Sequence, residues 1–316
     1  MSNFWEKLKK TGRPIYVLAP MAGITDWPFR QICREFGSDV VVSEMASVAA
    51  LAYSPAKTLA MLANPKKVRP YVVQLFGSSP EQFAKAVKLL SRQSKIKIDG
   101  WDINFGCPVP KVLKQGAGSA LFKDLKKSRQ VIEAVLANTN LPVSVKVRSK
   151  VGSITVIDFL KTIKDLPVAA IMIHGRSLAQ GFAGPVDAGI IKQARQYFKG
   201  VIIANGGVND LASAKKLLAE SGADGLGLAR GVLGKPWLFQ ELKGKNEKVK
   251  AKSSQDLRFI KKVIIKHGRL VEKYNGNFQD FRKHLCWYAS GLPKAKDLRQ
   301  KFIKVNSLAE IKNILK

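Results

Sequence analysis

The sequence predicts a TIM (β/α)8 barrel over residues 1–242, followed by a small all-helical C-terminal domain over residues 243–316. Three observations predict this fold class. Eight short apolar runs recur along the first domain, helical stretches separate them, and the strand pattern stops after a polar, basic stretch. Parallel strands that are buried on both faces and joined by crossover helices give this pattern. A doubly wound open sheet is the structural alternative, but the eight runs show no reversal of strand order.

The apolar runs are the expected strands of the barrel. They are Ile15–Leu18, Val40–Val42, Tyr71–Leu75, Trp101–Ile103, Val143–Val147, Ala170–Ile173, Val201–Ala204 and Gly225–Leu228. The segments between them carry apolar residues at helical spacing, and several begin with Asp, Thr or Pro, which are typical of helix N-termini. The expected helices are Asp26–Phe36, Pro80–Gln93, Lys126–Ala137, Thr155–Leu166, Asp187–Tyr197 and Asp210–Glu220.

The C-terminal region differs from the barrel in both pattern and charge. Its first part, Lys243–Gln255, is polar and basic and is expected to be a linker. Amphipathic helices are expected at Asp256–Tyr274, at Phe278–Tyr288 and around Leu298 and Ile311. The region holds 20 Lys and Arg residues against 6 Asp and Glu residues, a net charge of +14. Such a domain is expected to bind a polyanion.

Composition limits the class of protein. The 316 residues carry a net charge of +31 but are 46% hydrophobic, which indicates a folded body rather than a basic disordered chain. A Lys-rich proteome would also raise the total charge, so the enrichment in the C-terminal region is the more informative number. Three cysteines, Cys33, Cys107 and Cys286, are too few for a disulfide framework or a four-ligand zinc site. We therefore expect no metal, no membrane segment and a cytoplasmic protein.

Candidate residues, most of them polar or glycine, lie near or after the ends of most of the predicted strands, where a barrel of this kind carries its reactive groups. They are Pro20, Met21, Ala22, Gln74, Asn104, His174, Arg176, Asn205, Gly206, Gly207, Ala229 and Arg230. The glycines after strands seven and eight would let the backbone approach a phosphate, although a tight turn also accounts for Gly206 and Gly207. Single amides are common at strand ends, and His174 could either bind a ligand or cap its strand.

Lys146 and Cys107 are the sharpest single candidates. A lysine inside a strand is costly to bury unless it meets an anion, and because Lys146 and Arg148 share a face, both would point inward together. The alternative is that both point outward. Cys107 lies between Gly106 and Pro108, where we expect an exposed thiol that can donate or accept a proton. A buried turn cysteine is the alternative there.

Several longer motifs cover nearly the whole chain. They are LAPMAGITDWPFR (18–30), QLFG in strand three, INFGCPVPKV (103–112), GAGSAL (116–121), VKVR (145–148), HGR (174–176), ANGG (204–207), GVLGKPWLF (231–239) and RKHLCWYASGLP (282–293). Together they resemble the tRNA-dihydrouridine synthase family of flavin enzymes. The resemblance implies a flavin-binding TIM barrel followed by a helical domain that grips RNA.

The resemblance also implies roles for individual residues. FMN would lie against Pro20, Met21, Ala22, Gln74, Lys146 and His174, with its phosphate at Asn205, Gly206, Gly207, Ala229 and Arg230. NADPH would reduce the flavin, and the C5=C6 bond of specific tRNA uridines would then be reduced to 5,6-dihydrouridine with Cys107 as proton donor. Asn104 would orient the base, and Arg176, Arg282, Lys283 and His284 would contact the RNA. Many family members have Gly before the Arg at 230 and a second Arg at 178, where this chain has Ala229 and Leu178.

Two rival functions are an FMN-dependent dehydrogenase of a free pyrimidine and a non-catalytic RNA-binding protein. A free base requires neither the overall charge of +31 nor a basic appendage. A protein that only binds RNA would not need Cys107, Lys146 and His174 together. The target uridines and the preference for NADPH over NADH remain open at this point, and we expect a monomer.

Overall fold

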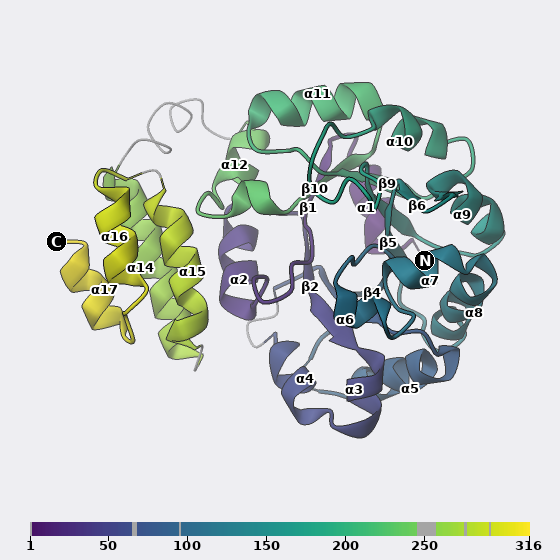
Figure 1. Cartoon of the computed structure of the whole chain (residues 1–316), viewed down its shortest axis with the longest axis horizontal. Coiled ribbons are helices and arrows are strands. Elements are labelled where there is room, and N and C mark those ends of the chain that lie inside the picture. Colours follow the sequence, from purple (N-terminus) through teal and green to yellow (C-terminus); the bar gives the residue numbers. More distant parts are fainter. Residues whose placement is uncertain (1, 65–67, 95, 245–256, 275–276, 291) are drawn as a thin grey trace.

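The computed structural model describes residues 2–64, 68–94, 96–244, 257–274, 277–290 and 292–316. A closed ring of strands is surrounded by helices, and a bundle of further helices lies beside two of them, α2 (Trp27–Glu35) and α12 (Leu238–Leu242) (Figure 1). Residues 245–255 of the predicted linker lie outside the described residues.

All eight predicted strands form one closed parallel barrel, which confirms the predicted fold class. The strands are β1 Ile15–Leu18, β2 Val40–Ser47, β3 Tyr71–Phe76, β4 Gly100–Asn104, β5 Val143–Arg148, β8 Ala170–His174, β9 Val201–Asn205 and β10 Gly225–Leu228. The open sheet is excluded because β1 pairs with both β2 and β10. A short antiparallel hairpin that the sequence did not predict, β6 Lys150–Val151 with β7 Ile154–Thr155, follows β5.

The helices of the barrel begin where the sequence supplies capping side chains. The side chains of Asp26, Ser79, Asp124, Thr155, Asp187 and Asp210 each accept a hydrogen bond from a backbone N–H in the first turn of the following helix. In chain order the helices are α1 Phe4–Lys9, α2, α3 Val48–Tyr53, α4 Ala56–Met61, α5 Pro80–Ser91, α6 Pro110–Leu113, α7 Ser119–Lys123, α8 Leu125–Leu136, α9 Val156–Ile163, α10 Ala188–Ala194, α11 Leu211–Ser221, the 3-10 turn η1 Arg230–Val232, and α12.

The barrel interior is apolar at its lower end, where the strands begin, and polar at its upper end, where the strands end. Side chains such as Val17, Val42 and Met172 fill the lower end, and Trp5 on α1, only 3% exposed, packs with them. The inward positions nearer the C-terminal ends of the strands are taken by polar groups, among them Gln74. Because apolar packing below holds the strands, the polar groups above are displayed on a rigid frame.

Four described helices form the C-terminal bundle: α14 Leu257–Lys273, α15 Phe278–Ala289, α16 Ala295–Phe302 and α17 Leu308–Ile314. Their apolar faces form one cluster that includes Trp237 from the end of the barrel, and Phe36 packs against it. Lys266 on α14 also pairs with Glu35 on α2. Among the helices described, none combines the length and the apolar character that would let it cross a membrane.

Candidate functional site

One cavity of about 740 Å³ opens at the C-terminal ends of the barrel strands. It is lined by all the residues that the sequence singled out in the barrel: Pro20, Met21, Ala22, Gln74, Asn104, Cys107, Lys146, His174, Arg176, Asn205, Gly206, Gly207, Ala229 and Arg230. Its volume lies in the range of about 300–1,000 Å³ that is usual for small-molecule and cofactor sites. The fold therefore brings residues from most of the strands to one place.

The cavity is cationic. Lys146, Arg148, Arg176 and Arg230 line it, and no Asp or Glu of the described residues does. Lys146 and Arg148 both face the cavity, as their shared strand face predicted. The Lys146 Nζ donates a hydrogen bond to Asn205 Oδ1 at 3.2 Å. Burial lowers the pKa of Lys146 to about 8, although the charge of Asp102 opposes this shift.

His174 is a neutral imidazole in this setting. Burial, followed by the positive charges of Lys146 and three arginines, lowers its pKa to about 3. Its Nε2 lies 3.5 Å from a terminal nitrogen of Arg176, whose Nε donates to the Gly184 carbonyl at 2.8 Å. A neutral His offers one N–H donor and one ring acceptor, so it can hydrogen-bond a ligand without adding to the charge.

The backbone after β9 is shaped to approach a ligand. Gly206 and Gly207 have φ values of +112° and +71°, in the region that favours glycine. A Cβ on Gly206 would lie 2.8 Å from the His174 ring. Both glycines line the cavity, so the turn that they make faces it. The exposed Arg230 guanidinium stacks over the Phe182 ring at 4.2 Å and stays at the mouth.

The structure corrects the expected exposure of Cys107. The residue is only 9% exposed and packs with Val112 and Ala117, although it also lines the cavity. Gly118 lies against it so closely that a Cβ there would come within 2.9 Å of the Cys107 carbonyl oxygen. Burial raises the pKa of the thiol, while Arg148 and Lys146 oppose the shift. The sulfur is therefore protonated at neutral pH and shielded from bulk water.

The Asn104 side chain serves the Cys107 loop. Its Oδ1 accepts hydrogen bonds from the backbone N–H groups of Gly106 at 3.1 Å and Cys107 at 2.9 Å. Its Nδ2 donates to Gln74 Oε1 at 2.9 Å, and Gln74 Nε2 donates in turn to Asp102 Oδ2 at 2.7 Å. The oxygen and the nitrogen of each of these two side-chain amides are therefore both hydrogen-bonded to the protein.

Asp102 and Phe182 bear on the site and were missed, and the contacts that Arg148 makes from its predicted strand face were not foreseen. Asp102 lies beneath the cavity, and its position two residues before Asn104 on β4 was the signal that could have found it. Arg148 donates to the carbonyls of Gly106 at 3.0 Å and Ser177 at 3.0 Å, which ties two loops of the mouth together. Phe182, 58% exposed, stands at the rim, and no strand pattern pointed to it.

The three residues predicted on α15 are separate from the cavity. Lys283 is partly exposed and pairs with Asp280 at 3.4 Å. The Arg282 side chain donates to the Val305 carbonyl at 3.0 Å and to Asn306 Oδ1 at 2.7 Å. His284 is only 1% exposed, and its ring lies 4.7 Å from that of Phe29 on α2. The expectation that His284 contacts the RNA is therefore corrected, because it packs between the barrel and the bundle.

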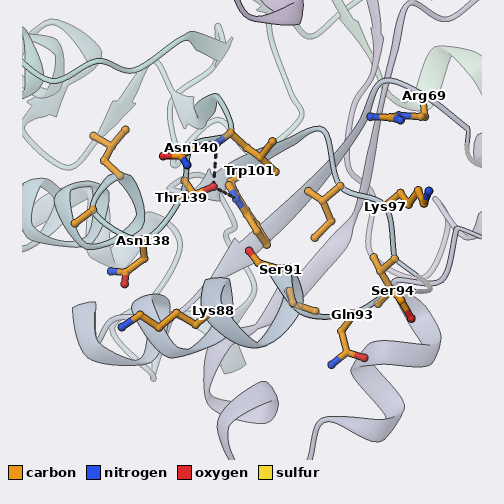
Figure 2. Close-up of a pocket in the computed structure, with 16 residues that line it drawn as sticks. Arg69, Lys88, Ser91, Gln93, Ser94, Lys97, Trp101, Asn138, Thr139 and Asn140 are labelled. Atoms are coloured by element: carbon orange, nitrogen blue, oxygen red, sulfur yellow. Dashed lines mark hydrogen bonds between the residues drawn. The ribbon is translucent and has the colours of Figure 1, made fainter.

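A second hollow of about 800 Å³ lies at the opposite end of the barrel, among the loops that precede β4 and β5 (Figure 2). The Thr139 hydroxyl there accepts hydrogen bonds from Trp101 Nε1 at 2.9 Å and from the Leu141 N–H at 3.0 Å. Its described lining holds three cations, Arg69, Lys88 and Lys97, but no Cys, His, Asp or Glu. Among its described residues it therefore offers no carboxylate, imidazole or thiol. Across the described part of the chain, no group of three or more His, Cys, Asp and Glu side chains is placed to hold a metal ion.

The sequence model of the dihydrouridine synthase family matches residues 17–316. The chain belongs to this family. A relative named "Probable tRNA-dihydrouridine synthase" from Rickettsia conorii is 34% identical over 289 residues, which cover 90% of this chain and 86% of that protein. A "tRNA-dihydrouridine synthase B" from Pseudomonas aeruginosa is 30% identical over 90% of this chain and 87% of the relative. As a member of the dihydrouridine synthase family, the protein is an enzyme.

Solved structures with a similar fold are more distant in sequence. The old yellow enzyme homologue from Zymomonas mobilis is 15% identical with a TM-score of 0.51, and the match covers 70% of this chain and 86% of that one. The 6-hydroxypseudooxynicotine amine oxidase from Pseudomonas geniculata N1 is 12% identical with a TM-score of 0.55, over 79% of this chain and 50% of that one. At such low identity these matches show the barrel fold alone.

Proposed function

We propose that this protein is an FMN-dependent tRNA-dihydrouridine synthase of the cytoplasm, which uses NADPH to reduce specific tRNA uridines to 5,6-dihydrouridine. The observation that carries the proposal is that Cys107, Lys146, His174 and the Gly206–Gly207 turn line one cavity. The names of relatives that share about a third of its residues support the same activity.

The residues of the cavity fit FMN. The two glycines with positive φ leave backbone N–H groups open to a phosphate, and Arg230 stands beside them at the mouth. The phosphate would be held by Asn205, Gly206, Gly207, Ala229 and Arg230, and the ring by Pro20, Met21, Ala22, Gln74, Lys146 and His174. When bound, FMN would supply the hydride chemistry that links NADPH to C6 of the uracil.

Cys107 supplies the proton that completes the reduction. Its raised pKa keeps the thiol protonated at neutral pH, so the sulfur can give its proton to C5 as C6 receives a hydride. The two additions together saturate the C5=C6 bond. The thiolate that remains is stabilised by Arg148 and Lys146 and regains a proton from solvent.

Lys146 and His174 have different roles, one as a positive charge and the other as a neutral hydrogen-bond donor. The partly buried Lys146 ammonium would stabilise negative charge on a flavin ring bound beside it. His174 stays neutral and would donate a single hydrogen bond. Because both side chains come from adjacent strands, β5 and β8, the frame of the barrel fixes their separation.

The RNA would approach across the mouth, with residues 243–316 as its basic RNA-binding domain. A uracil inside a folded RNA can reach Cys107 only if its nucleotide leaves the stack and enters the cavity. Arg176 at the cavity and Lys283 on α15 are the cations best placed for phosphate or base contacts. The net charge of +14 over residues 243–316 favours RNA over a free pyrimidine as substrate.

The decisive experiment maps dihydrouridine in tRNA from cells with and without the gene. We expect dihydrouridine to be lost at one or a few positions and restored by the wild-type gene but not by a gene encoding Cys107→Ala. An unchanged map in cells that lack the gene would contradict the proposal.

A further inference from the structure

A buried carboxylate lies directly beneath the site, and none of the roles above uses it. Asp102 on β4 is only 5% exposed, and the strand register places it beside Gln74 on β3 and Ser144 on β5. Its Oδ1 accepts a hydrogen bond from the Ser144 hydroxyl at 2.6 Å, and its Oδ2 accepts one from Gln74 Nε2 at 2.7 Å. A carboxylate is costly to bury, so its retention here calls for a reason.

A chain of hydrogen bonds runs from Asp102 to Cys107, and every donor in it points toward Asp102. Gln74 Oε1 accepts from Asn104 Nδ2 at 2.9 Å, and Asn104 Oδ1 accepts from the Cys107 N–H at 2.9 Å. An ionised carboxylate can only accept, so Gln74 must turn its NH2 toward Asp102. This leaves the Gln74 oxygen for Asn104, and hence the Asn104 oxygen for the backbone of Cys107. We call Asp102, Gln74 and Asn104 the relay.

The ionised state of Asp102 is compatible with this direction. Burial raises its pKa to about 6, while hydrogen bonds from Gln74 and Ser144 and the charge of Lys146 oppose the rise. The group therefore carries its charge at neutral pH. Hydrogen bonds to a charged acceptor are roughly twice as strong as neutral ones, so the first bond of the relay is its firmest.

We propose that Asp102 is a positioning residue of the reduction: it fixes the direction of the relay and thereby holds the backbone of Cys107 at the wall of the cavity. This inference rests on the proposed function, since the thiol that is positioned is the proposed proton donor. Displacement of a reacting group by about 1 Å can cost about 10²-fold in rate, so the relay matters although it does not touch the substrate.

Two substitutions at Asp102 separate the direction of the relay's hydrogen bonds from the negative charge of the carboxylate. Asp102→Leu keeps the branched shape of the side chain, with methyl groups in place of the carboxylate oxygens, but accepts no hydrogen bond, so Gln74 is free to turn over. Asp102→Asn can aim its oxygen at Gln74 and its NH2 at the Ser144 hydroxyl, which can also accept, so the direction is kept without the charge. Ser144→Ala is the matched control, because Ser144 contacts the same carboxylate but does not lie between Asp102 and Cys107.

The experiment uses the full chain and two readouts. The first is hydrogen exchange of the backbone amides at 105–107, compared with those of β8. The second is the single-turnover rate of dihydrouridine formation in the flavin-loaded enzyme. We expect Asp102→Leu to speed exchange at 105–107 by about tenfold, leave β8 unchanged and slow the reaction by about 10- to 100-fold. Asp102→Asn and Ser144→Ala should stay within about threefold of wild type in both.

Several results would overturn the inference. They are wild-type exchange and rate in Asp102→Leu, equal losses in Asp102→Leu and Asp102→Asn, or faster exchange throughout the barrel. If Asp102→Leu does not fold, Gln74→Met breaks the relay one residue later and is judged by the same exchange measurement. A wild-type enzyme that forms no dihydrouridine would refute the proposed function instead, while hydrogen exchange would still decide whether the relay holds Cys107.

Discussion

Two hollows of similar volume lie at opposite ends of the same barrel, about 740 Å³ at the C-terminal ends of the strands and about 800 Å³ at the other end. At the first, buried charged and polar groups from many strands converge, and the pKa values of Cys107, Lys146 and His174 are all displaced by burial. At the second, Lys88 and Lys97 are exposed to solvent. Volume does not mark the functional end of the barrel, whereas the convergence of buried ionisable groups does.

The largest expected effect comes from the thiol that distinguishes the two ends. Cys107→Ala should cut dihydrouridine formation by about 10²- to 10⁴-fold, because a positioned acid is removed, and should leave reduction of the flavin by NADPH unchanged. The two half-reactions are measured separately by stopped-flow absorbance and by product analysis. Cys286→Ala, on the bundle, is the control and should affect neither. Equal loss of both half-reactions in Cys107→Ala would make the cysteine structural.

The glycine turn gives the next largest effect. Gly206→Ala should weaken FMN binding by at least about tenfold, or about 1.4 kcal/mol, because its Cβ would press against the His174 ring. Gly222→Ala is a matched control, since Gly222 also has positive φ, +57°, but a Cβ added there would meet no atom within 4 Å. Titration of the two apoproteins with FMN measures the difference. Equal affinities would remove the turn from the cofactor site.

A smaller effect concerns pH. Lys146 has a pKa of about 8 and is charged below that pH, so the affinity for the anionic FMN should fall by up to about tenfold from pH 7 to pH 9 as the ammonium loses its proton. His174, with a pKa of about 3, is neutral throughout this window and should not contribute. Lys146→Met should bind FMN more weakly and with a flat profile. A wild-type profile that is flat between pH 7 and pH 9 would contradict the assignment.

The smallest effect compares two surface lysines. Lys283→Ala, on the bundle side of the mouth, should weaken tRNA binding by a few-fold and reduce the slope of log affinity against log salt by about 1. Lys97→Ala, at the opposite hollow, should change neither. Fluorescence anisotropy at several salt concentrations measures both. A larger loss in Lys97→Ala would place the RNA at the wrong end of the barrel for the chemistry.

The sequence was sufficient to predict the barrel because its strands are short, buried on both faces and separated by capped helices. It predicted less well where local pattern is weak. Beyond Val42, β2 continues through Ser43 and Glu44, and an irregularity in its pairing with β3 interrupts the apolar run. The two-residue strands β6 and β7 are too short to show any period.

The barrel residues of the site were predictable because parallel strands end at the same face. The burial of individual site residues was not predictable, because it depends on segments that lie far apart in the chain. Cys107 is covered by the loop that returns at Gly118. His284 is enclosed by Phe29 and His267, whose rings lie 4.7 Å and 5.0 Å away. The role of Asp102 likewise emerges only when three neighbouring strands are seen in register.

The most direct test of the account is incubation of the purified, flavin-loaded protein with NADPH and an unmodified tRNA transcript, followed by mass analysis of the nucleosides. We predict that the wild-type protein adds two hydrogens to specific uridines and that Cys107→Ala, with the same flavin content, yields almost none. Product formed equally by both proteins, or by neither while the flavin is reduced normally, would contradict the assignment of the cavity as the site of uridine reduction.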